Sequence, residues 1–327
     1  MRKISIGKIR RLQQLSNGKG IMSMCAVDHR GSLMRMLGGE QNEKEHVGYQ
    51  AMVDFKLDLC QVLAPHASAI LLDPIYGAAQ AIASGVLPSS TGLLVSLEET
   101  GYSGATEARI TNLLPGWDVG KIKKMGAVGV KLLLYYRPDS DVASKQLDTV
   151  RQVADDCSLE DIPFVVEPVS YKITELEADP REFARIKPEL VVKTAGQITA
   201  FPIDVLKAEF PADLKQEKDR SRLLEFCHEL DEASQVPWVI LSAGVDFDLF
   251  SQEVEIACQA GASGFLAGRA LWQEATKINS REERLDFLKT TVVKRLESLT
   301  ELANAYGTPW YTKLEPCEID GHWYSAY

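Results

Sequence analysis

The sequence has 327 residues, 45% of them hydrophobic and 25% charged, and its formal net charge is −10 at pH 7. This balance is typical of a globular protein with enough apolar surface to build a core, so disordered and fibrous classes are excluded. The negative charge argues against nucleic acid or an anionic membrane surface as a partner, because a protein binds either of them through clusters of its own cationic side chains.

Eight short apolar runs recur along the chain, each followed by a longer stretch with helical spacing. They predict strands at 21–27, 69–72, 92–96, 128–134, 163–169, 204–210, 238–242 and 264–266. The intervening stretches predict helices, among them 44–63, 188–201, 223–232 and 251–260, and a closing helix at 282–302. This alternation is typical of parallel strands joined by crossover helices.

Eight β–α repeats favour a closed (β/α)8 barrel, the TIM barrel of the α/β class. We expect a single domain over 1–327, with an irregular tail from about 308 whose role the sequence does not indicate. An open doubly wound sheet is the alternative, because periodicity does not report closure. The sixth strand is the least certain, since the apolar segment 190–193 competes with 204–210.

No stretch reaches the ~20 apolar residues of a membrane span, and the basic start at 1–16 lacks the apolar run of a signal peptide. The six cysteines include no CxxC pair and several have apolar neighbours, so buried, reduced thiols are expected. These features predict a cytoplasmic protein. Whether it forms a homo-oligomer is left open.

In barrels of this type the active site lies at the C-terminal ends of the strands. The polar residues at or near the predicted strand ends are Asp28, His29, Arg30, Asp73, Lys131, Glu167, Lys207, Glu209, Ser242 and Arg269. We take these residues as the candidates for chemistry.

The seventh and eighth strands are followed by segments suited to an anion. Ser242 and Gly244 follow one strand, and Gly268 and Arg269 follow the next. Glycines let backbone N–H groups approach a phosphate, and the loops after these two strands are the usual phosphate site of the fold. The structural alternative is a pair of tight turns with Arg269 solvated or paired to a carboxylate.

Lys207 lies in an apolar strand, where residues 205, 207 and 209 share one face. Burial and a nearby cation lower the pKa of a lysine from ~10.4 toward neutrality, which leaves an amine able to attack a ketone. Lys131 is a candidate for that cation. A structural ion pair, Lys207 with Glu209 or Lys131 with Glu167, is the competing interpretation.

Glu167 is flanked by apolar residues, which predicts a raised pKa and a role in proton transfer. Asp28 is a candidate for orienting substrate hydroxyls or the lysine. For either carboxylate alone, a structural role is equally compatible with the sequence.

No cofactor and no metal site is predicted. A zinc site needs several histidines as ligands, and of the five present (29, 46, 66, 228 and 322) only His29 lies at a strand end. Asp28, Asp73 and Glu167 are the weaker alternative for holding a metal.

The chain resembles the class I tagatose-1,6-bisphosphate aldolases and the related sulfofructose-phosphate aldolases over nearly its whole length. The resemblance is carried, in order, by AVDHRG at 26–31, SAILLD at 68–73, VKLLLYY at 130–136, EPVSY at 167–171, DVLK at 204–207, LSAGV at 241–245 and AGRA at 267–270. Two departures stand out: these families usually have Gln where this chain has His29, and the residues from Glu315 extend past their usual end.

The resemblance implies that Lys207 forms a Schiff base and that Glu167 shuttles protons. It further implies that Asp28 and Lys131 support substrate and intermediate. The phosphate of a phosphosugar substrate would then meet Ser242, Gly244, Gly268 and Arg269. His29 is a possible substrate contact whose effect on specificity is open.

The predicted function is therefore cleavage of D-tagatose 1,6-bisphosphate to dihydroxyacetone phosphate and glyceraldehyde 3-phosphate. Cleavage of 6-deoxy-6-sulfofructose 1-phosphate is an alternative within the same chemistry. A metal-dependent sugar-phosphate isomerase or epimerase, or a metabolite sensor without catalysis, are the alternatives from other classes.

Overall fold

The structure, a computed structural model, describes residues 1–38, 47–325 and 327. Eight parallel strands form a closed barrel in chain order, in which β9 pairs with β2. The strands are β2 Met22–Ala26, β3 Ala69–Leu72, β4 Gly92–Ser96, β5 Gly129–Tyr135, β6 Phe164–Val169, β7 Val205–Ala208, β8 Trp238–Leu241 and β9 Gly264–Ala267. All eight predicted strands and the closed TIM barrel are confirmed, and the open sheet is excluded.

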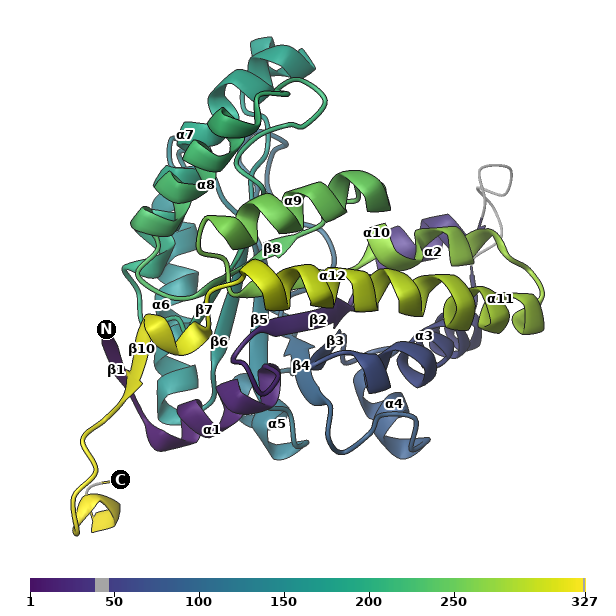
Figure 1. The fold of residues 1–327 in the computed structure, drawn as a ribbon, viewed down its shortest axis with the longest axis horizontal. Helices are drawn as coiled ribbons and strands as arrows, with labels where there is room; N and C mark the ends of the chain where they lie inside the picture. Colours follow the sequence, from purple (N-terminus) through teal and green to yellow (C-terminus); the bar gives the residue numbers. More distant parts are fainter. Residues whose placement is uncertain (39–46, 326) are drawn as a thin grey trace.

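The helices surround the barrel (Figure 1). They are α1 Ile6–Leu15, α2 Gly31–Gly38, α3 Tyr49–Leu63, α4 Ala78–Ala83, α5 Val119–Lys124, α6 Ala143–Leu159, α7 Pro180–Thr199, α8 Arg220–Ala233, α9 Phe247–Gln259, α10 Arg269–Trp272, α11 Arg281–Phe287 and α12 Val293–Tyr306. Short 3-10 helices are η1 Ala64–His66, η2 Leu176–Ala178, η3 Gln273–Lys277, η5 Trp310–Thr312 and η6 Trp323–Ser325, and η4 Leu288–Val292 is a π-helix. The predicted start of the helix at 44–63, with His46, lies outside the described residues.

Two predicted helix boundaries need correction. Helix α7 begins at Pro180, with Asp179 as its N-cap, so Pro188 lies inside the helix rather than at its start. The competing segment 190–193 therefore belongs to α7. The predicted closing helix at 282–302 is divided by the π-helix η4 into α11 and α12. Leu288 and Val292 of η4 and Leu296 of α12 are all buried, so one apolar face continues through the interruption.

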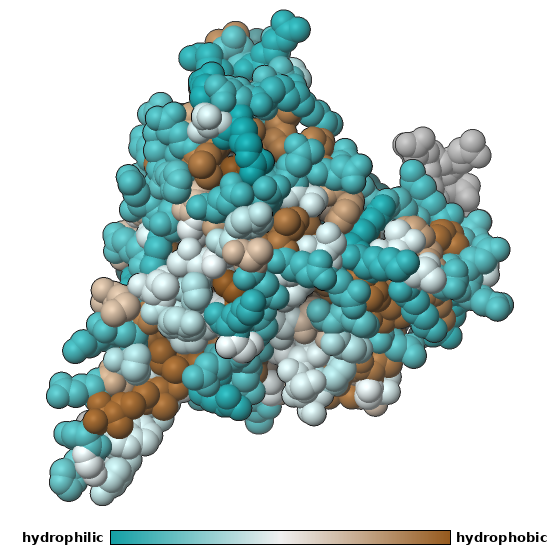
Figure 2. All heavy atoms as spheres, in the orientation of Figure 1, coloured by the Kyte–Doolittle hydropathy of each residue, from teal (hydrophilic) through white to brown (hydrophobic). Residues whose placement is uncertain are grey.

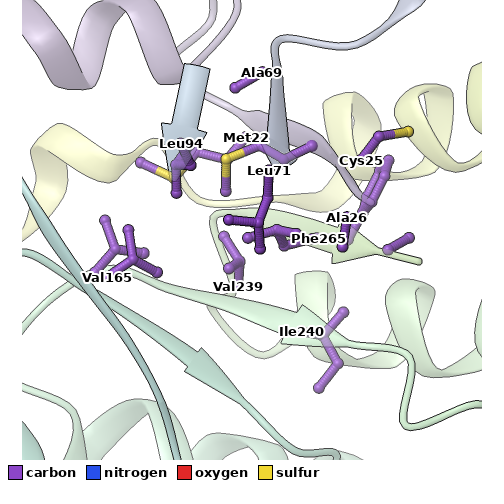
Figure 3. Close-up of a cluster of buried hydrophobic side chains, with 14 of the residues drawn as sticks. Met22, Cys25, Ala26, Ala69, Leu71, Leu94, Val165, Val239, Ile240 and Phe265 are labelled. Carbon is purple, nitrogen blue, oxygen red and sulfur yellow. The ribbon is translucent and has the colours of Figure 1, made fainter. Parts of the chain in front are cut away.

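The barrel interior is filled by apolar side chains below the polar strand ends. Figure 3 shows Met22, Leu71, Leu94, Val165 and Val239 gathered in the space that the strands enclose, and all five are buried. Side chains two residues apart on a strand share a face. Glu167 and Leu241, two positions after Val165 and Val239, therefore also point inward, toward the C-terminal mouth of the barrel.

The two chain ends meet at the opposite end of the barrel. Strand β1, Arg2–Ile4, pairs in parallel with β10, Leu314–Pro316. Arg2 also donates to the carbonyl of Phe201 (2.7 Å), just before β7. The tail from 308 is thus less irregular than predicted, and Figure 1 shows it leaving the body beside β1. The face drawn in Figure 2 is mostly hydrophilic, with an apolar patch near this tail. Ile319, in the tail, is exposed.

Within the described residues, no helix combines the length and apolarity needed to cross a membrane. The cysteines are free; five are buried and Cys317 is half-buried.

Candidate active site

The C-terminal ends of the strands surround a cavity of about 590 Å3. Its walls contain most of the predicted site residues: Asp28, His29, Lys131, Glu167, Lys207, Ser242, Gly268 and Arg269. They come from strands β2, β5, β6, β7, β8 and β9 or from the segments that follow them. The barrel therefore brings together side chains that are up to 241 positions apart in the sequence.

Lys131 is the centre of the charged cluster. Its Nζ lies 2.7 Å from Asp28 Oδ2 and 2.9 Å from both Glu98 Oε1 and Glu167 Oε2. Burial alone would lower the pKa of Lys131, but Asp28, Glu167 and Glu98 raise that pKa well above the ordinary value. Lys131 is therefore an ammonium ion.

Lys207 and Glu167 form the second part of the cluster. Lys207 Nζ lies 2.8 Å from Glu167 Oε1, and both residues are buried. Glu167 thus contacts a different lysine with each oxygen. A carboxylate and an amine at this separation are within hydrogen-bond reach and can exchange a proton.

The sequence predicts a raised pKa for Glu167, and this prediction is wrong. Burial raises the pKa of Glu167, but the positive charges of Lys131 and then Lys207 outweigh it, and the net effect is a lowered pKa. The apolar neighbours along the strand were visible in the sequence, whereas the two ammonium groups come from other strands. Asp28 follows the same pattern: burial raises its pKa, and the ammonium groups of Lys131 and Lys207 hold it well below the usual range.

The loops after β8 and β9 face each other at one wall of the cavity. Ala243 and Gly244 both have positive φ angles, 46° and 80°, so the chain turns sharply after Ser242. A Cβ on Gly244 would come within 2.9 Å of Arg269 Cζ, and one on Gly268 within 2.7 Å of His29 Cε1. Both glycines are therefore needed for close approach, and Arg269 lies directly against the Gly244 backbone.

His29 is held beside these loops. Its ring makes an edge contact with Trp272, with centroids 5.1 Å apart. Burial lowers the pKa of His29 to about 3, and the charges of Arg269, Lys207 and Lys56 act in the same direction against Asp28. The imidazole is therefore neutral, and its buried Nδ1 has no hydrogen-bond partner among the described residues.

Two further predicted site residues, Asp73 and Glu209, contact groups outside the charged cluster around Lys131. Asp73 is fully buried, pairs with Lys56, and accepts from the backbone N–H of Tyr76 (2.8 Å), so it serves the helix–barrel junction outside the cavity wall. Glu209 lines the cavity, and its Oε2 accepts from the backbone N–H of Ser170 (2.8 Å).

Glu98 is a site residue that was not predicted from the sequence. It is buried in the segment after β4, where its Oε2 accepts from the N–H of Leu133 (3.0 Å) while Oε1 contacts Lys131. The rule that site residues follow strand ends, applied to β4 as to the other strands, would have found it.

Among the described residues, no group of three or more His, Cys, Asp and Glu side chains is arranged to hold a metal ion. The three carboxylates that converge in the cavity surround the Lys131 ammonium. The alternative set of Asp28, Asp73 and Glu167 is not assembled, because Asp73 pairs with Lys56.

The sequence matches the model of the DeoC/LacD family aldolases over residues 22–274. Tagatose 1,6-diphosphate aldolase 1 of Enterococcus faecalis is 32% identical over 96% of this chain and 100% of its own length. Tagatose 1,6-diphosphate aldolase 2 of Streptococcus agalactiae is 34% identical over 91% of this chain and 96% of its own. An archaeal fructose-1,6-bisphosphate aldolase, solved with its catalytic lysine bound to the carbinolamine intermediate, has a TM-score of 0.56 at 17% identity, covering 92% of this chain and 100% of that chain.

Proposed function

The chain belongs to the DeoC/LacD aldolase family, and we propose on this premise that it is a Schiff-base-forming aldolase that cleaves D-tagatose 1,6-bisphosphate. The products are dihydroxyacetone phosphate and glyceraldehyde 3-phosphate. The observation that carries the proposal is the contact of 2.8 Å between Lys207 Nζ and Glu167 Oε1 at the base of a cavity bordered by Arg269. We further propose that the enzyme acts in the cytoplasm, where phosphorylated sugars are metabolised.

Formation of the Schiff base begins with a proton transfer from Lys207 to Glu167. The neutral amine then adds to the C2 carbonyl of the substrate and forms a carbinolamine. The proton now on Glu167 goes to the carbinolamine hydroxyl, which leaves as water. Lys207 is then an iminium, and Glu167 is again a carboxylate.

Cleavage follows from the same two groups. Glu167 takes the proton of the C4 hydroxyl while the C3–C4 bond breaks, which releases glyceraldehyde 3-phosphate. The bonding electrons move to the iminium and give an enamine, so the nitrogen of Lys207 acts as the electron sink. Protonation of the enamine at C3 and hydrolysis of the iminium release dihydroxyacetone phosphate and return Lys207.

The other residues take supporting roles in this proposal. Lys131 fixes Asp28 and Glu167 through the contacts of 2.7 and 2.9 Å. His29, neutral and with a free Nδ1, is placed to contact a substrate hydroxyl. Ser242, Gly244, Gly268 and Arg269 bind the phosphate of the dihydroxyacetone phosphate half.

Borohydride trapping tests the Schiff base. Treatment with borohydride and dihydroxyacetone phosphate should inactivate the enzyme irreversibly and, by peptide mass mapping, label Lys207. Dialysis against a strong chelator should leave aldolase activity unchanged. A label on Lys131 instead, or loss of activity that zinc restores, would contradict the proposal. Faster turnover of 6-deoxy-6-sulfofructose 1-phosphate than of tagatose bisphosphate would keep the chemistry and reassign the substrate.

Removal of the Arg269 guanidinium tests the phosphate site. Arg269→Ala should weaken inhibition by inorganic phosphate about tenfold to hundredfold, since a charge-assisted contact contributes roughly 1.5–3 kcal/mol. Inhibition constants measured on folded protein provide the comparison. Arg10→Ala, at an exposed arginine of α1, serves as the matched control and should not change them. Equal inhibition of Arg269→Ala and the parent would place the anion elsewhere.

A further inference from the structure

The three carboxylates around Lys131 are not equivalent. A lysine ammonium has three N–H donors. At Lys131 two of these donors bind Asp28 at 2.7 Å and Glu98 at 2.9 Å, and Glu167 forms an ion pair with the ammonium at 2.9 Å. The Lys131 ammonium is therefore enclosed by three carboxylates.

Glu98 is the carboxylate that is fixed to the barrel. Its second oxygen accepts from the backbone N–H of Leu133, two residues along the strand from Lys131 itself. Its backbone carbonyl accepts from Arg30 (2.7 Å), and its backbone forms an antiparallel bridge with Leu113. Glu98 is thus held through its carboxylate, its carbonyl and its main chain.

The other two carboxylates face the reaction centre with their second oxygens. Glu167 Oε1 contacts Lys207 at 2.8 Å, and Asp28 Oδ1 lies 3.8 Å from the neutral His29 ring. Both groups must stay in place while the proton positions on Lys207 and Glu167 change. If Lys131 moved together with either carboxylate, Glu167 would no longer be correctly placed beside Lys207.

We propose that Glu98 is a positioning residue that anchors Lys131 to strand β5, so that Lys131 holds Glu167 and Asp28 at fixed places beside Lys207. This inference rests on the proposed function. It assigns Glu98 an effect on turnover through Lys131 and Glu167, without a contact to the phosphate of the substrate.

Glu98→Gln removes the charge and keeps the size of the side chain. We expect kcat to fall about tenfold to hundredfold, the scale of one charge-assisted contact, while KM changes by less than about threefold. Loss of a negative charge beside Lys131 and Glu167 lowers the pKa of both an ammonium and a carboxylate. Both limbs of the pH profile of kcat/KM should therefore move to lower pH.

Two further variants isolate this effect. Glu98→Asp keeps the charge and should leave the pH profile closer to that of the parent than Glu98→Gln does. Glu107→Gln removes an exposed acid from the same segment and should leave kcat and the pH profile unchanged. If Glu98→Gln does not fold, Glu98→Asp decides through kcat alone, because its shorter side chain draws the carboxylate away from Lys131 and Leu133: a kcat equal to that of the parent contradicts the anchoring role.

Trapping separates failure of this inference from failure of the proposed function. Borohydride and dihydroxyacetone phosphate should still label Lys207 in folded Glu98→Gln. Labelling with unchanged kcat and pH profile overturns the role of Glu98 alone, and so does a raised KM with unchanged kcat. Absence of label in the parent enzyme overturns the Schiff-base chemistry on which the inference rests.

Discussion

Lys207→Met should abolish cleavage of tagatose bisphosphate, with a loss in kcat on the order of 10⁵–10⁶, the scale seen when a covalent nucleophile is removed. Methionine keeps much of the length and apolar character of the side chain but cannot form an iminium. Coupled detection of dihydroxyacetone phosphate, with enough enzyme to reach single-turnover conditions, measures the loss.

The variant must be shown to be folded with its phosphate site intact. Lys207 is buried and pairs with Glu167, so its removal leaves Glu167 with Lys131 as its remaining cation. Binding of inorganic phosphate by calorimetry should persist, because Arg269 is unchanged. Lys193→Met, at an exposed lysine of α7, is the control and should retain activity. Activity of Lys207→Met within about tenfold of the parent would remove Lys207 from the mechanism.

The barrel could be predicted because its strands are local signals. Runs such as 238–241 and 264–266 are apolar over their whole length, as fully buried parallel strands are. The inward direction of Glu167 follows from the two-residue period, since it lies two positions beyond Val165 of the interior layer. The parallel pairing of β1 with β10 joins residues about 310 positions apart, and no pattern of neighbouring residues predicts such a pair.

The electrostatics of the site could not be predicted from neighbours along the chain. Glu167 lies among apolar residues in the sequence, which suggested a raised pKa, yet the ammonium groups that lower it belong to β5 and β7. Asp73 follows a strand, as the site residues do, but it forms an ion pair with Lys56 of α3 instead of facing the cavity. Only the folded chain shows which charges meet.

Glu167→Gln should lower kcat by roughly 10²–10⁴, the usual contribution of a general acid or base. Glutamine keeps the size of the side chain and some hydrogen bonding to Lys131 and Lys207. It cannot accept the proton of the C4 hydroxyl, so the bond-breaking step should carry the loss. Steady-state cleavage of tagatose bisphosphate measures it, with Glu189→Gln at an exposed acid of α7 as the control.

The two roles open to Glu167 give different results in this variant. If Glu167 is a proton carrier, its loss leaves the Lys207 amine and the phosphate-binding loops intact. Prolonged incubation with dihydroxyacetone phosphate and borohydride should then still label Lys207, although more slowly. A structural partner of two lysines would instead show a lower melting temperature and a kcat close to the parent in the folded fraction. Cleavage within about threefold of the parent rate by folded Glu167→Gln would assign the proton transfer to Asp28 or Glu209, two other carboxylates of the cavity wall.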